Sequence, residues 1–295
     1  MDDATNRPVL VGVDGSASAT NAVRWAAAEA VRRRAPLVLV HVWAPLPAAL
    51  PHAVGLGSYD DARIEAGRRL LEDASVVARE AAPDVTTSTD LGHGSAAGHL
   101  IGMSATAGLV VLGSRGLGGF SGLVIGSIAV AVATHGQCPV VVVRGTEPRT
   151  TLRQEGPVVV GADGSPTSQA GIRFSFEAAS LRDAPLVAVH AWSDVPLPPS
   201  RELASSWDPV RQQELEVLDQ RLAESRALYP AVRVERVVVR DNPAHVLLDR
   251  AEDAQLVVVG SRGRGGFRGL LLGSTSQALI YHAACPVAVV PPPRT

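Results

Sequence analysis

Two glycine-rich segments with the same spacing are the strongest sign of chemistry in this 295-residue chain. Each reads Gly-x-x-Gly, then nine residues, then Gly-Ser, and the second lies 147 residues after the first. Glycines at a strand end let a ligand approach the backbone, and the N–H groups of such a loop and of the following helix bind anions. The repeated pattern therefore predicts a phosphate-bearing ligand at Gly113, Gly116, Gly126 and Ser127 in the first copy, and at Gly260, Gly263, Gly273, Ser274 and Thr275 in the second.

An aspartate follows the first apolar run of each copy, in the sequence Val-Gly-x-Asp-Gly-Ser. The candidate binding residues are Asp14 with Gly12 in the first copy, and Asp163 with Gly161 in the second. Because a carboxylate repels phosphate, we expect these aspartates to accept hydrogen bonds from ribose hydroxyls or to hold Mg²⁺ through water. The alternative is a structural role, in which the aspartate tightens the turn between strand and helix.

Further candidate contacts lie at the end of the second strand of each copy. His41 and His190 stand there, and the backbone beside them could pair with the edge of a base, whereas we expect their rings to pack. Asp194 is a candidate ribose contact, although the first copy has Pro45 in place of an acidic residue.

The two glycine-rich loops differ in charge. The first contains Arg115 alone, whereas the second contains Arg262, Arg264 and Arg268. Because guanidinium groups match phosphate oxygens well, this difference predicts tighter and more salt-sensitive nucleotide binding in the second copy. The alternative is that these arginines are solvated surface charges.

The composition excludes several classes of protein. All 27 basic residues are Arg; without Lys, neither a phosphate loop of the Gly-x-x-x-x-Gly-Lys type nor Schiff-base chemistry is available. The net charge of −2 gives no support for a nucleic-acid partner or an acidic membrane. The acidic, polar start of the chain and the shortness of its apolar runs predict a cytoplasmic protein without secretory signal or membrane span. Cys138 and Cys285, each in a Cys-Pro-Val sequence, are expected to be small buried hydrophobes.

Strand-like and helix-like patterns alternate within each copy. Continuous Val and Leu runs separated by helices predict an α/β fold of two tandem, doubly wound domains, each with a five-stranded parallel sheet. We place the domains at residues 1–146 and 157–295, with a polar linker at 147–156. In the first copy the expected strands are 8–13, 37–42, 85–90, 109–112 and 140–143, and the expected helices are 18–34, 60–82, 95–105 and 127–135.

Serines mark several of the expected helix starts. Ser165 precedes Pro166, which is typical of a cap residue before the first helical position. Ser127 and Ser274 are expected to cap the fourth helix of each copy, whose remaining N–H groups can still bind a phosphate. If strands 1 and 4 are neighbours, as in the order 3-2-1-4-5, the aspartates and the glycine loops meet where such sheets bind ligands.

These motifs make the chain similar to the universal stress protein family, in its tandem, ATP-binding form. The resemblance covers nearly the whole chain, through the glycine pattern, the Val-Gly-x-Asp-Gly-Ser start and the final Cys-Pro-Val strand. It implies a Rossmann-like 3-2-1-4-5 sheet, ATP with Mg²⁺ as ligand, and a role as a nucleotide-dependent regulator of stress response or growth. It also implies that Asp14 and Asp163 contact the nucleotide and that the backbone near Val40 and Val189 meets adenine. Pairing of the final strands would join the two copies, and a homodimer is expected.

Two other functions stay open at this point. The first is slow ATP hydrolysis, for which the sequence offers no paired carboxylates and no Ser/His/Asp arrangement tied to the loops. The second is a non-catalytic dimerisation scaffold with vestigial pockets, although two intact loops argue against it. A dinucleotide dehydrogenase is disfavoured, because the loops do not read Gly-x-Gly-x-x-Gly and follow the fourth strand.

Overall fold

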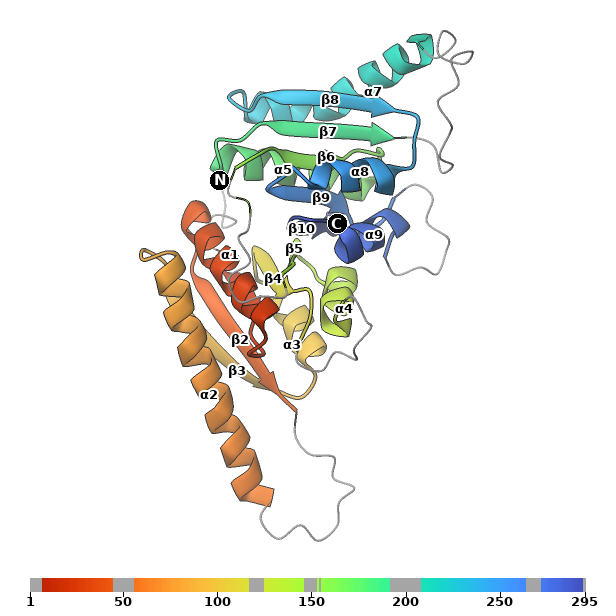
Figure 1. Ribbon diagram of the computed structural model, residues 1–295. Coiled ribbons are helices and arrows are strands. Elements are labelled where there is room, and N and C mark those ends of the chain that lie inside the picture. Colours follow the sequence, from red (N-terminus) through yellow and green to blue (C-terminus); the bar gives the residue numbers. More distant parts are fainter. Residues whose placement is uncertain are drawn as a thin grey trace. The chain divides into compact units, whose positions relative to one another are not determined.

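The structure, a computed structural model, divides into two compact units, residues 1–150 and 151–295, and each is an α/β unit (Figure 1). It describes residues 7–44, 56–116, 125–145, 153, 155–191, 208–263 and 272–293. The first unit consists of β1 (Val9–Gly12), α1 (Ala17–Arg33), β2 (Leu37–Trp43), α2 (Leu56–Ala81), β3 (Thr87–His93), α3 (Ala96–Met103), β4 (Leu109–Gly113), α4 (Ser127–His135) and β5 (Val140–Val143). The second consists of β6 (Val158–Gly161), α5 (Pro166–Leu181), β7 (Leu186–Ala191), α7 (Asp208–Leu228), β8 (Val234–Val239), α8 (Pro243–Ala251), β9 (Leu256–Gly260), α9 (Ser274–His282) and β10 (Val287–Val290).

Each unit has a parallel sheet with the expected strand order. In the first, β1 pairs with β2 and β4, β2 also pairs with β3, and β4 also pairs with β5. In the second, β6 pairs with β7 and β9, β7 with β8, and β9 with β10. Both units therefore have the order 3-2-1-4-5, which places the carboxyl ends of the first and fourth strands side by side.

Helices cover both faces of each sheet, as the Val-rich central strands require. In the first unit α1 contacts α2 on one face and α3 contacts α4 on the other; in the second, α5 contacts α7 and α8 contacts α9 (Figure 1). Cys138 and Cys285 are buried before the last strand of each unit, as expected, and burial raises the pKa of the Cys285 thiol to about 12. This thiol is therefore part of the core and is not a reactive group.

The third strand of the first unit does not lie where the sequence predicted it. We expected a strand at residues 85–90, but β3 begins at Thr87 and continues to His93, in register with Leu37 to Trp43 of β2. Val85 is buried just before the strand begins. The prediction followed this apolar residue, whereas β3 has only one neighbouring strand and carries mostly polar residues that are partly exposed.

The start of the fourth helix also differs from the prediction. Ser127 and Ser274 do not cap their helices: each is the first helical residue and exposed, and the cap positions belong to Gly126 and Gly273. Neither glycine, having no side chain, makes a side-chain capping hydrogen bond. By contrast, Ser165 caps α5 ahead of Pro166, as expected.

Candidate functional site

The aspartate after the first strand and the glycine loop after the fourth strand lie against each other in both units. A Cβ atom placed on Gly116 would come within 2.5 Å of Asp14 Oδ2. The corresponding atom on Gly263 would come within 2.5 Å of Asp163 Oδ2. These two glycines therefore allow the loop backbone to lie directly beside the carboxylate, at the edge where open α/β sheets bind ligands.

Each aspartate also stabilises the turn that it begins. Ser16 N donates to Asp14 Oδ1 at 3.0 Å, and Ser165 N donates to Asp163 Oδ1 at 2.9 Å. This is the structural role considered as an alternative for these residues. This hydrogen bond uses Oδ1 of each aspartate, while Oδ2 faces the glycine loop.

A serine in each unit ties the two loops together. Ser16 Oγ accepts a hydrogen bond from Ala19 N at 3.1 Å and donates to Arg115 O at 3.1 Å. In the second unit, Ser165 Oγ accepts from Ser168 N at 3.1 Å and donates to Arg262 O at 3.3 Å. We had not identified these serines as site residues, although both stand in the repeated Asp-Gly-Ser sequence.

Some of the predicted site glycines have packing roles. A Cβ on Gly113 would lie 2.6 Å from the carbonyl carbon of Ser18, and one on Gly260 would lie 2.5 Å from Thr167 Oγ1. These glycines let the first helix approach the end of the fourth strand. Gly12 lies inside β1, where a Cβ would meet Leu112 Cδ2 at 2.6 Å. In the corresponding place, a Cβ on Gly161 would meet Leu247 Cδ1 at 3.1 Å.

The last glycine of each motif has no such packing requirement among the described residues. A Cβ on Gly126 would meet nothing closer than 3.8 Å, and one on Gly273 nothing closer than 3.5 Å. Their φ angles, −72° and −65°, suit any residue. Because Gly126 has no Cβ, there is space between loop residues 114–116 and the N-terminus of α4. Gly273 leaves the same space between residues 261–263 and the N-terminus of α9. A helix N-terminus next to exposed loop backbone is a suitable place for a phosphate.

The end of the second strand is fixed to the end of the first in both units. Val40 O accepts from Val13 N at 2.8 Å, and Val189 O accepts from Ala162 N at 2.8 Å. The His41 ring also contacts the end of the first strand, because its Nδ1 lies 2.7 Å from the Val13 carbonyl oxygen. As expected, this ring packs inside the domain, where a Cβ on Gly67 would lie 2.8 Å from His41 Cδ2.

Arg144 is a basic residue near the first glycine loop that the sequence analysis missed. It follows β5, and Ser114 N donates to the carbonyl of the preceding residue, Val143, at 2.9 Å. Burial and the positive charge of Arg115 lower the pKa of Arg144. Arg115 is therefore not the only arginine at this edge, and the charge difference between the two units is smaller than predicted. Of the other predicted site residues, Asp194, Arg264 and Arg268 lie outside the described residues.

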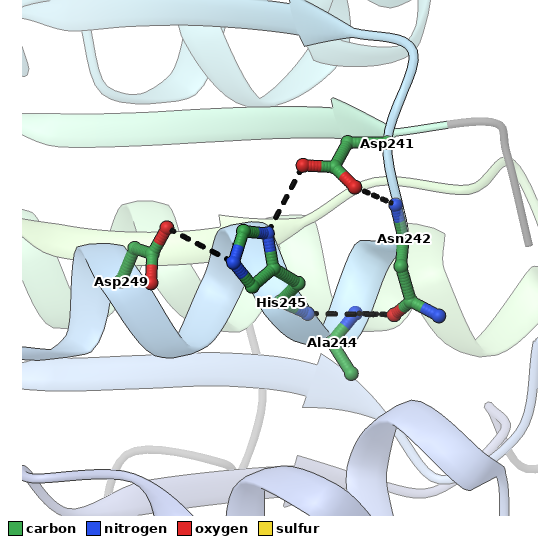
Figure 2. A network of polar contacts seen from close by, with 5 residues as sticks. All are labelled: Asp241, Asn242, Ala244, His245 and Asp249. Atoms are coloured by element: carbon green, nitrogen blue, oxygen red, sulfur yellow. Dashed lines mark hydrogen bonds and ion pairs between the residues drawn. The ribbon is translucent and has the colours of Figure 1, made fainter. Parts of the chain in front are cut away.

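Another polar cluster lies at the start of α8, after β8. Figure 2 shows the His245 ring between two carboxylates, with Asp241 Oδ2 3.0 Å from Nδ1 and Asp249 Oδ2 3.8 Å from Nε2. Asn242 caps the helix by accepting from Ala244 N at 2.9 Å. Within the described ranges, no group of three or more His, Cys, Asp or Glu side chains is placed to hold a metal ion. Nor is any helix there long and apolar enough to cross a bilayer.

The fold and the paired loops define a tandem α/β protein with one candidate anion site per unit. The family model for the universal stress protein family matches residues 5–144 and 156–291. The chain is 40% identical over 289 residues to a universal stress protein of Mycobacterium tuberculosis, with 95% of each chain covered. It is 39% identical over 296 residues to one of Mycolicibacterium smegmatis, with 99% of each covered. The chain therefore belongs to the universal stress protein family, with two such domains in tandem.

A solved structure supports the fold over both domains. A universal stress protein from Archaeoglobus fulgidus aligns with a TM-score of 0.72 at 18% identity, covering 97% of this chain and 98% of that one. At this level of identity the match concerns the fold alone.

Proposed function

We propose that each domain binds one adenine nucleotide, ATP with Mg²⁺, and that the chain is a nucleotide-dependent regulator of stress response or growth. The last glycine of the motif carries this proposal. Gly126 and Gly273 have ordinary backbone angles and no close neighbour, yet both domains have glycine at this helix start. A phosphate that approaches the loop and the helix N-terminus accounts for an absent side chain there.

The other residues fit a nucleotide laid across the carboxyl ends of the first and fourth strands. Asp14 Oδ2 and Asp163 Oδ2 would accept hydrogen bonds from the ribose, and the backbone near Val40 and Val189 would meet the base. The phosphates would lie over the glycine loop, where Arg115 or Arg262 offers a positive charge. The chain's own groups thus position each part of the ligand, and Mg²⁺ would neutralise phosphate charge when bound.

Calorimetric titration of the nucleotide-stripped full chain with Mg-ATP tests the proposal. The expected result is two sites per chain, one of which is lost in Gly126→Val and the other in Gly273→Val. Both substitutions should leave the fold intact, because a Cβ at either position has room and valine at a cap position costs only about 1 kcal/mol. Gly102→Val is a matched control, since Gly102 lies on α3, away from the loops, and a Cβ there would meet nothing within 4 Å among the described residues.

Several outcomes would contradict the proposal. Unchanged nucleotide binding in a chain that carries both Gly126→Val and Gly273→Val would show that the nucleotide does not bind at these loops. The absence of saturable binding of ATP, ADP and AMP to the wild-type chain would favour a scaffold with vestigial pockets. Turnover well above about 1 per second would favour an ATP hydrolase. The homodimer implied by the family resemblance is tested separately, by light scattering with and without Mg-ATP.

A further inference from the structure

The histidine at the end of the second strand has different surroundings in the two domains. In the first, His41 Nδ1 lies 2.7 Å from the Val13 carbonyl oxygen. In the second, His190 Nδ1 lies 2.6 Å from the Ala162 carbonyl oxygen, and Nε2 also lies 3.1 Å from Glu214 Oε2 on α7. The His190 side chain is only 4% exposed, whereas that of Glu214 is 31% exposed. A carboxylate on the rim of the domain thus contacts a buried ring.

The same helix position meets the ring in both domains. The helices α2 and α7 end 147 residues apart, and so do the starts of the strands that follow them, which places Gly67 opposite Glu214 in the repeat. A Cβ on Gly67 would lie 2.8 Å from His41 Cδ2. In the first domain, therefore, the helix packs directly against the ring. The second domain has a carboxylate at this point instead.

The two contacts of the His190 ring described above are both with oxygen atoms. A carbonyl oxygen and a carboxylate oxygen are both acceptors, so a ring that bonds to both must donate from both nitrogens. A neutral ring would turn a lone pair toward one of these oxygens. Glu214 on α7 lies 3.1 Å from Nε2, and on β8 the residue paired with His190 is Val238.

We propose that Glu214 is a positioning residue for the nucleotide site of the second domain. Acting through His190, it holds the Ala162 carbonyl and so fixes Asp163, the next residue, beside the glycine loop. The second domain achieves with a charged pair what the first achieves by packing Gly67 on the ring. This inference rests on the proposed function, because the residue it positions is the expected ribose contact.

Substitutions of Glu214 in the full chain test this role, in a Gly126→Val background that leaves only the second site. Glu214→Ala should weaken Mg-ATP binding about fivefold to tenfold, because it removes the carboxylate that lies 3.1 Å from the His190 ring. Glu214→Gln should bind like the parent, because its amide can donate to Nε2 of a neutral ring that keeps its Nδ1 bond. Glu216→Gln, an exposed position on the same helix, is the matched control and should change nothing.

A further measurement separates positioning from mere folding. Nitrogen-15 spectra of the His190 ring should show two protonated nitrogens in the parent and one in Glu214→Gln. Parent-like affinity in Glu214→Ala, or an unprotonated ring nitrogen in the parent at neutral pH, would overturn the inference. If the parent binds no nucleotide, the proposed function fails together with the positioning role, and the ring spectrum still decides whether the charged pair exists.

Discussion

Asp14 stabilises the turn after β1 with one carboxylate oxygen and faces Gly116 with the other. These two roles predict different results for two substitutions. Asp14→Asn keeps an oxygen that can accept from Ser16 N, so its free energy of unfolding should lie within about 0.5 kcal/mol of the wild-type value. Asp14→Ala loses that hydrogen bond and should be about 1 kcal/mol less stable. Both should weaken nucleotide binding in the first domain about tenfold, because neither keeps the charged acceptor.

Urea unfolding and calorimetry of the two Asp14 variants provide the measurement. The corresponding changes at Asp163 serve as controls, and they should act on the second site alone. Equal affinity for nucleotide in Asp14→Asn and wild type would restrict Asp14 to the structural role.

Residues adjacent in sequence to a motif were easier to predict than residues brought near it by pairing. The aspartates and glycine loops could be identified, because their types and spacing repeat in both copies. Arg144 could not, because it reaches Arg115 only through the pairing of β4 with β5. Ser16 and Ser165 have a visible signal in the repeated Asp-Gly-Ser sequence. Their contacts with Arg115 O and Arg262 O depend on how the two loops fold together.

Helix α1 contains a buried ion pair that should contribute much more than a similar exposed pair. Glu29 is fully buried and its Oε1 lies 2.6 Å from Arg33 Nε, whereas Glu65 and Arg69 on α2 form the same i,i+4 pair at 3.2 Å with both side chains exposed. Glu29→Ala leaves the Arg33 charge without this partner and should lower the free energy of unfolding by about 3–5 kcal/mol. Glu65→Ala should lower it by less than about 0.5 kcal/mol. Similar urea midpoints for the two variants would contradict this ranking.

The start of α8 should make stability depend on pH. The hydrogen bond to Asp241, and then the charge of Asp249, raise the pKa of His245 above 6.5. The Asn242 N–H, and then His245, lower the pKa of Asp241 below 3.8. The histidine contribution is fully present below pH 6.5 and is lost as pH rises through its raised pKa. The aspartate contribution is present above pH 3.8 and is lost as pH falls through its lowered pKa. The cluster in Figure 2 therefore stabilises the helix most between pH 3.8 and pH 6.5, where both contributions are present.

An NMR titration of the His245 ring checks this prediction. The observed pKa should lie above 6.5, and Asp241→Asn should reduce it more than Asp249→Asn does. An unchanged titration curve in Asp241→Asn would show that the pair does not persist in solution.

Elements with buried faces on both sides were predicted best, because their Val and Leu runs are continuous. The edge strand β3 was misplaced, since a strand at the edge of a sheet can contain the polar sequence from Thr87 to Asp90. The cap positions of α4 and α9 were assigned to the serines because serine is a favoured cap residue. The structure assigns them to the preceding glycines, Gly126 and Gly273.

The whole chain has two loops with the same glycine spacing but different charge, so its two sites should differ in affinity. We predict tighter and more salt-sensitive nucleotide binding in the second domain, which has Arg262, Arg264 and Arg268. Arg144 beside Arg115 should reduce this difference, and Arg144→Gln should restore it. Titration of the Gly126→Val and Gly273→Val variants at several salt concentrations measures each site separately. Equal affinities and equal salt slopes would contradict the prediction.

The open space at Gly126 and Gly273 has a consequence for how such chains evolve. One base change turns a glycine codon into a valine codon, and a Cβ at these positions meets no described atom closer than 3.5 Å. A mutation can therefore silence one site without loss of the fold or of the other site. Duplication thus gives a lineage room to keep one of the two proposed nucleotide sites while the second drifts toward another ligand.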